Sequence, residues 1–253
     1  PLKDFLQIMA DFDTITLPEM GKVTPLNRTD VKFVFHRDLL YDILVLARER
    51  YLSLVINDQR WANYDTLYFD SPDYRFYHDH HNKRLNRYKV RTRSYTDSDL
   101  HFFEIKFKSN KNRTIKSRIK INQPEELITK ESADFLRLKT AILPKNLKKS
   151  IQVRYKRMTL INRGLTERIT IDFDLNYIVD GQTFEYPELI ILEVKQNKAS
   201  KSRFMEIMHE QHLHRVSLSK YCFGIASYVD GIKKNNFKNQ IRYVKKICNT
   251  PRD

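Results

Sequence analysis

Basic side chains occur at every second position in two stretches of this chain that have the composition of β-strands. Successive side chains of a strand point to opposite faces, so each set of cations shares one face. Guanidinium groups bind phosphate oxygens through forked hydrogen bonds, and ammonium groups bind them as point charges. The spacing therefore indicates a surface that binds and neutralises phosphate groups. In 87–95 these side chains are Arg87, Lys89, Arg91 and Arg93, and in 115–121 they are Lys116, Arg118 and Lys120.

Carboxylates accompany the cations in two other alternating stretches. Glu104 shares a face with Lys106, and Glu193 shares a face with Lys195. Mg²⁺ binds one or two carboxylates together with substrate phosphate oxygens, and Mn²⁺ prefers the same oxygen ligands. Glu193 is our first candidate for a protein ligand to either metal. The other acidic candidates at inward-facing positions are Glu104, Asp172 and Asp174.

Each of these strands alone has a simple explanation, which is an amphipathic strand with a solvated charged face. That explanation is weaker for four strands together, because like charges on neighbouring strands repel each other. A polyanionic ligand would relieve the repulsion. A barrel can enclose such a ligand, and it tolerates a polar interior when that interior is a ligand channel. We therefore favour a barrel with a cationic interior over a flat charged sheet.

The composition also indicates a polyanionic partner. Lys and Arg number 46 against 31 Asp and Glu, which gives a net charge of +15. The two cysteines exclude a disulfide-rich scaffold and a Cys-rich zinc site. The five glycines argue against the glycine-rich phosphate loops of nucleotide-binding folds. No apolar run approaches the roughly 20 residues that a spanning helix needs, so we expect a cytoplasmic protein.

The pattern of elements predicts the α+β class, in which strands dominate and helices lie between and after them. We expect an N-terminal arm over 1–28 and one domain over 29–253 that ends in helices. The expected strands are 30–35, 66–70, 87–95, 102–108, 114–121, 151–160, 167–176 and 189–196, and the expected helices are 36–51, 126–140, 203–209, 219–229 and 232–247.

A series of short motifs follows one order along the chain: Leu-Tyr-Phe-Asp-Ser-Pro-Asp (67–73), Arg-Tyr-Lys-Val-Arg-Thr-Arg (87–93), Phe-Phe-Glu-Ile-Lys-Phe-Lys (102–108), Val-Arg-Tyr-Lys-Arg (153–157), Glu-Arg-Ile-Thr-Ile-Asp (167–172), Leu-Glu-Val-Lys (192–195) and Leu-Ser-Lys-Tyr (218–221). Each motif is weak alone, but their joint order is specific. Together they resemble the VTC domain, the catalytic domain of vacuolar transporter chaperones and of bacterial polyphosphate polymerase domain-containing proteins. That family belongs with the triphosphate tunnel metalloenzymes, which are relatives of the CYTH hydrolases.

The resemblance implies an antiparallel β-barrel tunnel with flanking helices, which holds a row of phosphates along its axis. It implies transfer of the γ-phosphate of ATP onto inorganic polyphosphate with Mn²⁺ or Mg²⁺. The expected ligands are thus ATP, triphosphate and polyphosphate, and no nucleic acid is expected. By position in the motifs, the implied catalytic residues are Lys32, Arg91, Arg93, Lys106, Arg157, Arg168, Lys195 and Lys220, the substrate-binding residues are Lys116, Arg118, Tyr155 and Ser219, with Lys89 on the face of Arg91, and the metal ligand is Glu193.

One stretch departs from the wider family. CYTH relatives begin with Glu-x-Glu-x-Lys, whereas this chain has Arg-Thr-Asp-Val-Lys at 28–32 and keeps only the lysine. The resemblance therefore does not imply a CYTH-type site with two metal ions. Eukaryotic relatives suggest a membrane-protein partner that would receive the product, and hence a cytoplasmic location at a membrane through that partner.

Three other functions stay open at this point. A tunnel-fold triphosphatase would use water as the phosphate acceptor, and its product would be free phosphate only. A non-catalytic module would bind polyphosphate without turning over ATP. A metal-dependent nuclease would fit Asp172 or Asp174 followed by Glu-Val-Lys at 193–195, but that pattern leaves the basic strands at 87–95 and 115–121 unexplained.

Overall fold

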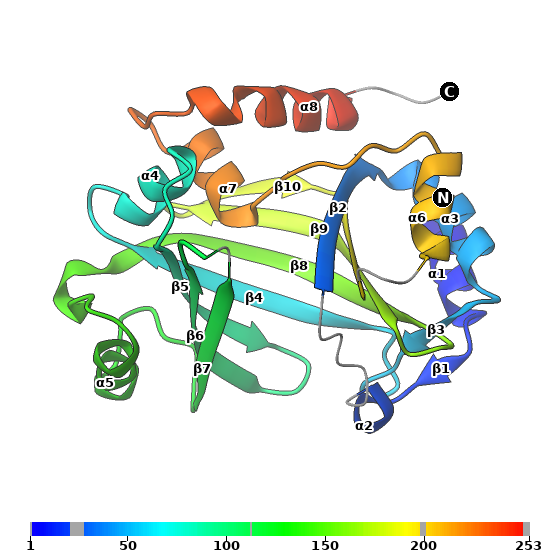
Figure 1. The fold of residues 1–253 in the computed structure, drawn as a ribbon, viewed down its shortest axis with the longest axis horizontal. Coiled ribbons are helices and arrows are strands. Elements are labelled where there is room, and N and C mark those ends of the chain that lie inside the picture. The colour runs from blue at the N-terminus through cyan, green and yellow to red at the C-terminus, as the bar shows by residue number, and fades with distance from the viewer. Residues whose placement is uncertain (1, 21–27, 112, 198–200, 250–253) are drawn as a thin grey trace.

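A computed structural model describes residues 2–20, 28–111, 113–197 and 201–249 of the chain. It contains one sheet of eleven strands with helices on its flanks (Figure 1). All strand pairs are antiparallel except the short pair β1–β3. The predicted α+β class with an antiparallel sheet is confirmed. Of the predicted arm, residues 21–27 lie outside the described residues.

The strands vary widely in length, and the longest ones, β9, β8 and β4, are adjacent in the middle of the sheet. Their bounds are β1 (Thr14–Ile15), β2 (Arg28–His36), β3 (Tyr51–Leu54), β4 (Trp61–Asp70), β5 (Arg87–Tyr95), β6 (Leu100–Lys108), β7 (Thr114–Ile121), β8 (Lys148–Asn162), β9 (Glu167–Val179), β10 (Gln182–Tyr186) and β11 (Leu189–Asn197).

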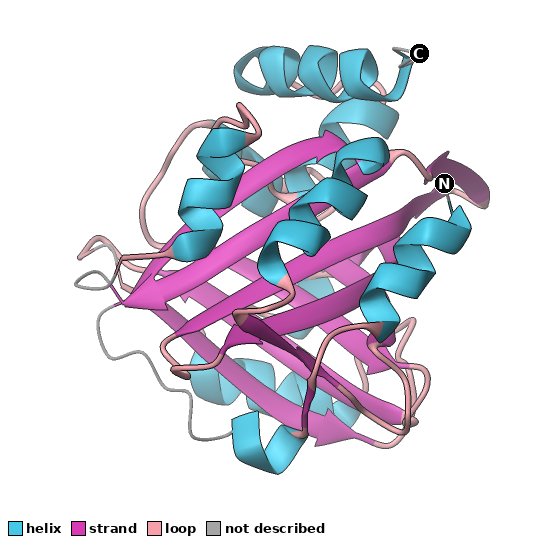
Figure 2. Cartoon of the chain, turned by 90° about the vertical axis from the view of Figure 1, so that its right-hand side faces the viewer, coloured by secondary structure: helices cyan, strands magenta, loops and turns pink. Residues whose placement is uncertain are grey.

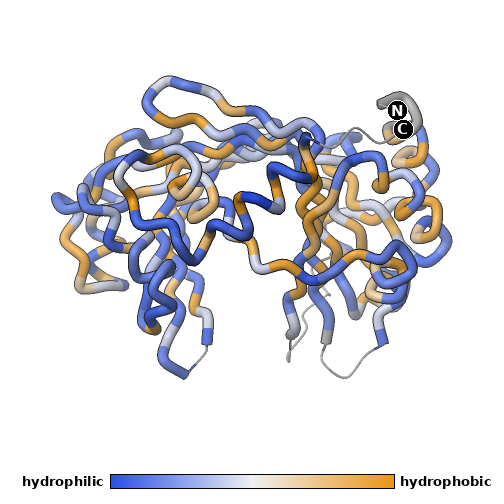
Figure 3. Tube along the Cα trace, turned by 90° about the horizontal axis from the view of Figure 1, so that it is seen from above, coloured by the Kyte–Doolittle hydropathy of each residue, from blue (hydrophilic) through white to orange (hydrophobic). Residues whose placement is uncertain are grey.

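The sheet curls but does not close. Its main path runs β2-β11-β9-β8-β4-β5-β6-β7, and among the described residues the end strands β2 and β7 are not paired with each other. Seen from above, the chain forms two arms with a gap between them (Figure 3). The predicted barrel is thus open along one side. We call its concave surface the channel, which is lined by side chains of β2, β4, β5, β6, β7, β8, β9 and β11.

Helices cover the outer surface at both ends of the sheet and the upper part of the concave surface. On the right of Figure 1, α1, α3 and α6 lie against the sheet (Figure 2), and α5 lies to the left of β6 and β7. Every described helix is too short or too polar to cross a lipid bilayer. The bounds are α1 (Leu2–Ala10), α2 (Leu17–Met20), α3 (Leu40–Ala47), α4 (Arg75–His81), α5 (Lys130–Lys139), α6 (Arg203–Glu210), α7 (Lys220–Tyr228) and α8 (Lys238–Asn249), with 3-10 turns η1 (Arg37–Leu39), η2 (Pro144–Asn146) and η3 (Asn235–Phe237).

The concave surface divides into an apolar part and a polar part. Val34, Val153, Leu175 and Ile191 belong to a buried cluster with α7 and α8. Side chains of a strand alternate with period two, so Lys32 shares a face with Val34 on β2, and Glu193 shares a face with Ile191 on β11. Lys32 and Glu193 are paired in register. The helix α7 therefore ends the apolar part, and its first residues lie where the charged part begins.

A bulge in β9 allows this strand to line both the apolar part and the polar part of the concave surface. Tyr155 of β8 is skipped in the pairing, and Asp174 has a left-handed φ of 49°. The extra residue shifts the alternation, so Asp172 and Leu175 both face inward. Asp174 turns to the outer face, where its carboxylate accepts from Lys156 Nζ at 2.9 Å. Our expectation that Asp174 faces inward was therefore wrong.

Several element limits differ from those predicted. The helix predicted over 36–51 ends at Ala47, and β3 follows it; β4 begins at Trp61 instead of Thr66. The hairpin β9–β10 was not predicted. Its turn is formed by Asp180 and Gly181, with φ of 48° and 79°, which is the two-residue Asp-Gly turn typical of tight hairpins.

The packing of α7 gives a prediction about stability. A Cβ added at Gly224 would lie 2.7 Å from Tyr177 Cδ1 and closer still to Ile151 Cδ1, and Tyr177 is fully buried. We expect Gly224→Ala to lower the free energy of unfolding by about 1–3 kcal/mol, because overpacking outweighs the gain in helix propensity. Urea unfolding measures the change.

The control is Gly164→Ala, whose added Cβ would meet nothing closer than 3.6 Å. Equal unfolding free energies for Gly224→Ala and the unmodified protein would show that α7 is not packed tightly against β8 and β9.

Candidate functional site

Cations of β2 and β5 meet at the two residues that precede α7. Lys32 Nζ on β2 donates to the Leu218 carbonyl at 2.9 Å, and Lys89 Nζ on β5 donates to Ser219 Oγ at 2.7 Å. Ser219 is the N-cap of α7, and its Oγ also accepts from the Cys222 backbone N–H at 3.3 Å. The segment 218–219 thus joins β2 to β5 across the open side of the sheet. Burial lowers the pKa of Lys32, and Glu193 opposes that shift.

Glu104 is held by two arginines of the neighbouring strand. Its Oε2 accepts from Arg91 Nε at 2.7 Å and lies 3.8 Å from Arg93 Nη1. Burial would raise the pKa of Glu104, but the two arginines outweigh it and lower that pKa. Arg93 Nη2 also donates to the Tyr155 hydroxyl at 3.4 Å, while Arg93 Nε is buried without a hydrogen-bond partner. A buried donor of this kind is available to a ligand oxygen.

Asp172 joins the sheet to α7. Its carboxylate accepts from Arg157 Nε at 2.5 Å and Nη2 at 2.7 Å, and also from Lys220 Nζ. Only 3% of its side chain is exposed. Burial alone would raise the pKa of Asp172, but Arg157 and Lys220 lower it strongly. Both oxygens are thereby occupied, so Asp172 positions two cations and is not open to a metal ion.

Glu193 and Lys195 form an ion pair on β11. Lys195 Nζ lies 3.2 Å from Glu193 Oε2. Burial would raise the pKa of Glu193, but Lys195, Lys32 and Arg157 lower it to about 2. Burial lowers the pKa of Lys195 to about 8. Glu193 is therefore ionised at neutral pH and lies among cations.

The described residues contain no group of three or more His, Cys, Asp or Glu side chains that could hold a metal ion. Magnesium often binds through one carboxylate and the phosphates of its substrate. Glu193 fits that mode, because its carboxylate is ionised at neutral pH and faces the channel. Glu104 fits it less well, since Arg91 and Arg93 hold its carboxylate.

Lysines of three adjacent strands lie directly opposite one another. Lys89 of β5 is paired in register with Lys106 of β6, which is paired with Lys116 of β7. Lys106 faces water inside the concave surface, and removal of part of its hydration lowers its pKa to about 7, helped by Lys89, Lys116 and Lys32. Like charges directly opposite each other destabilise a sheet, and an anionic ligand would remove that cost.

Arg118 and Arg168 each lie opposite another predicted residue of the site in strand register. Arg118 is exposed on β7 with its guanidinium carbon 4.5 Å from the centre of the Phe102 ring. Arg168 of β9 is opposite Lys195 in register. The concave surface brings together the remaining predicted residues, which are Lys32, Lys89, Arg91, Arg93, Glu104, Lys106, Lys116, Tyr155, Arg157, Glu193, Lys195, Ser219 and Lys220.

Two tyrosines beneath the cations, Tyr64 and Tyr68, were not predicted as part of the site. Tyr64 of β4 stacks on Tyr155 with ring centres 5.0 Å apart, and Arg93 and Arg157 lie over the Tyr64 ring at 5.3 and 5.0 Å. The Tyr68 hydroxyl accepts from Arg91 Nη1 at 3.3 Å. Electron-rich ring faces stabilise cations that are partly removed from water. Tyr64, Thr66 and Tyr68 have the spacing of one strand face, and this signal was missed because we expected the strand to begin at Thr66.

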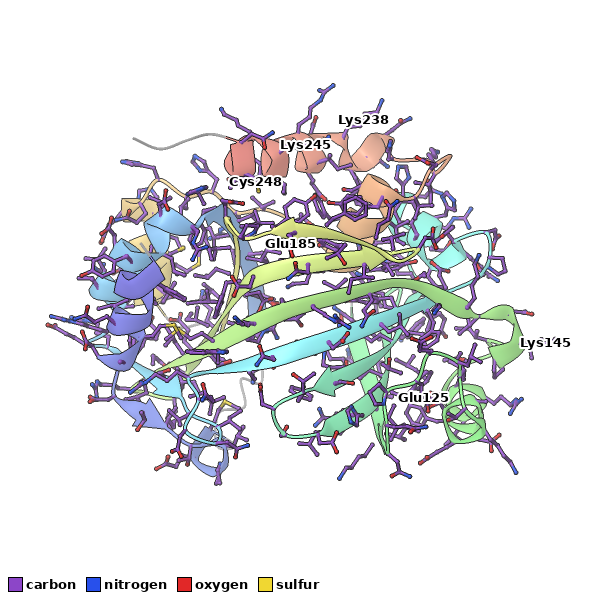
Figure 4. All side chains as sticks on the ribbon, turned by 180° about the vertical axis from the view of Figure 1, so that it is seen from behind. Glu125, Lys145, Glu185, Lys238, Lys245 and Cys248 are labelled. Atoms are coloured by element: carbon purple, nitrogen blue, oxygen red, sulfur yellow. The ribbon has the colours of Figure 1, made fainter. Side chains whose placement is uncertain are left out.

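A cavity of about 610 Å³ is lined by Arg154, Lys156, Asp65 and Asp174, among other residues. Figure 4 shows the sheet from behind, with Glu185 of β10 and no helix over the middle of β4 and β8. The cations of the cavity are already paired, since Arg154 lies 2.9 Å from Asp65 and Lys156 lies 2.9 Å from Asp174. The cavity therefore offers no excess charge to an anion, and we take the channel as the functional site.

Comparison with known proteins places the chain in a family. The VTC domain family matches residues 27–229. A triphosphatase-active protein from Hippeastrum has a TM-score of 0.49 and 12% identity, over 80% of this chain and 97% of that one. A candidate adenylate cyclase from Bacillus halodurans has a TM-score of 0.48 and 11% identity, over 81% of this chain and 98% of that one.

Similarity this distant says nothing about the activity of the chain, and no curated protein matches the sequence. The match to the VTC domain covers the strands and the α7 residues that build the channel, from β2 to Val229. The chain belongs to the VTC domain family.

Proposed function

We propose that this protein transfers the γ-phosphate of ATP onto inorganic polyphosphate within the channel, with Mn²⁺ or Mg²⁺ bound to Glu193 and to the phosphates. The main support is the excess of cations over carboxylates along one concave surface, whose like charges are opposed across strands. A row of linked phosphates matches this elongated distribution of charge. Membership of the VTC domain family supports the same substrate class.

In such a transfer, the protein positions the reacting groups and stabilises their charge, and it forms no covalent bond to the substrate. A terminal oxygen of the acceptor phosphate forms a bond to the γ-phosphorus, the bond from that phosphorus to the β–γ bridging oxygen breaks, and ADP leaves with the electron pair. Negative charge then spreads over the oxygens of the transferred group. Arg93 and Arg157 can donate to those oxygens, and both are fixed in place by neighbours before substrate binds.

A divalent metal would add charge neutralisation at the nucleotide phosphates when bound. On this chain, Glu193 would hold it, while Lys195 and Lys32 would orient the carboxylate and bind phosphate oxygens. The membrane-protein partner suggested by the resemblance stays a prediction.

The contacts of Asp172 and Asp174 argue against a nuclease. The Asp-Glu-x-Lys pattern needs two acids on one metal ion, but Asp172 is occupied by Arg157 and Lys220. Asp174 pairs with Lys156 on the outer face of the sheet. A triphosphatase remains the alternative, because it would use the same channel with water as acceptor.

Product analysis separates polymerase from triphosphatase. The purified protein is incubated with ATP and Mn²⁺, and the products are separated on a gel that is stained for polyphosphate. We expect a ladder of long chains. Free phosphate without polymer would favour the triphosphatase, and binding of polyphosphate without any turnover would favour a non-catalytic module.

Replacement of Arg93 tests the cationic surface. We expect Arg93→Ala to lower turnover by about 100-fold or more, because it removes preorganised donors to the transferred group. Arg93→Lys keeps the charge but loses the fork, and should recover only part of the rate. Steady-state kinetics measures both variants.

The control is Arg137→Ala, since Arg137 is exposed on α5 and forms an ion pair with Asp134 of the same helix. Full activity of Arg93→Ala would exclude a role for Arg93, and loss of cooperative thermal unfolding would instead make Arg93 structural.

Binding of triphosphate should weaken with salt. Many cation–phosphate contacts are screened as ionic strength rises, so we expect the dissociation constant to increase roughly ten-fold or more between about 50 mM and about 500 mM NaCl. Calorimetric titration with tripolyphosphate measures it. A dissociation constant that does not change over this range would contradict binding in a charged channel.

Glu193→Gln tests the metal ligand. The amide keeps the shape but loses the charge, so we expect a large loss of turnover and a higher Mn²⁺ concentration for half-maximal rate. Glu104→Gln is the comparison, because its carboxylate is held by arginines and its Mn²⁺ requirement should not change. An unchanged Mn²⁺ requirement in Glu193→Gln would exclude Glu193 as the ligand.

A further inference from the structure

The channel changes its chemistry along its length. Strand register places the inward side chains of β5, β6 and β7 in rows, and the first row lies next to α7, where Lys89 contacts Ser219 at 2.7 Å. The first row carries the most positive charge and the last row carries none, and aromatic rings appear only in the last two rows. In order, the rows are Lys89, Lys106 and Lys116; Arg91, Glu104 and Arg118; Arg93, Phe102 and Lys120; Tyr95 and Leu100.

The end of the channel far from α7 carries flat, partly exposed surfaces. The Tyr95 ring meets the Phe102 ring edge-on at 6.0 Å, and it also lies 4.8 Å from the Tyr64 ring. Arg118 lies over Phe102 at 4.5 Å. Leu100 is 36% exposed beside Tyr95, although it is apolar. Tyr95 and Phe102 are half-buried.

The same end is unfavourable for a chain of phosphates. The turn between β5 and β6 carries Asp97 and Asp99, and the Asp99 side chain is almost fully exposed. Asp97 accepts from both Asn63 nitrogens at 2.6 Å, which fixes this carboxylate at the turn. Two carboxylates at this end would repel phosphates, whereas the lysine row next to α7 would attract them.

We propose that the surface formed by Tyr95, Phe102 and Arg118 is the subsite for the base of the nucleotide, with the triphosphate extending from it toward the lysine row and α7. This proposal rests on the proposed function, since it assumes that ATP is the donor. Nucleobases stack on aromatic faces and on guanidinium planes, and Phe102 with Arg118 offers both. The γ-phosphate then lies nearer α7 than the base does.

Two ligands that differ only in the nucleoside test this assignment. The β,γ-imido analogue of ATP and inorganic tripolyphosphate are titrated calorimetrically into the whole chain without added metal, so that neither is turned over. We expect Phe102→Ala to weaken binding of the nucleotide roughly five- to one-hundred-fold, as for loss of one stacked base. Binding of tripolyphosphate should change by less than about two-fold. Phe102→Trp should retain nucleotide binding.

Phe107→Ala is the matched control, because Phe107 lies on the same strand as Phe102 but on the opposite face of the sheet. Its ring centre lies 4.6 Å from that of Tyr88. The variant should leave the ratio of the two affinities unchanged. If Phe102→Ala does not fold, Phe102→Leu keeps the apolar volume without the flat ring and serves the same comparison.

Each other result rejects the assignment. Equal weakening of both ligands would make Phe102 a structural residue of the channel wall. Unchanged nucleotide binding in Phe102→Ala would place the base elsewhere. If the unmodified protein binds tripolyphosphate but not the nucleotide, the channel stands as a phosphate site and the base subsite is wrong; if it binds neither, the proposed function itself fails.

Discussion

Repulsion between cations on one concave surface is the constraint on which this structure depends. Lysines of β5, β6 and β7 lie directly opposite one another, and Lys32 approaches them from the other arm of the sheet. A fold does not gain stability from such an arrangement. Partial loss of hydration, together with like-charged neighbours, lowers the pKa values of Lys32, Lys106 and Lys195. An anionic ligand of the proposed kind would make these positions favourable.

The fold tolerates this repulsion by placing a few carboxylates between the cations and by packing the rest of the sheet tightly. Glu104, Asp172 and Glu193 each hold cations at fixed positions. Asp172 can do so because the bulge at Asp174 changes which residues of β9 face inward. On the apolar side of the bulge, α7 packs on Tyr177 and Ile151, which fixes the helix end that carries Ser219 and Lys220. Packing and charge are therefore coupled through one helix.

The sequence predicted the strands with regular alternation well. The limits of β5 and β7 match those expected, because their charged and uncharged residues alternate without interruption. The sequence could not show that Lys32 and Lys89 meet at 218–219, since that contact depends on the curvature of the whole sheet. It also could not show that Asp172 and Asp174 face opposite sides, because a bulge breaks the period on which the expectation rested. Tyr64 was missed for a simpler reason, which is that β4 begins earlier than its most strand-like residues.

The central claim is that the cations of β2, β5, β8 and α7 bind one linear polyanion between them. A crystal structure of the protein with tripolyphosphate tests it most directly. We predict a continuous chain of phosphate density along the concave surface, within hydrogen-bond distance of Arg93 and Arg157 and of at least one lysine from the other arm. Density confined to the outer surface, for instance along the exposed Lys238 and Lys245 of α8 (Figure 4), with an empty channel, would contradict the account.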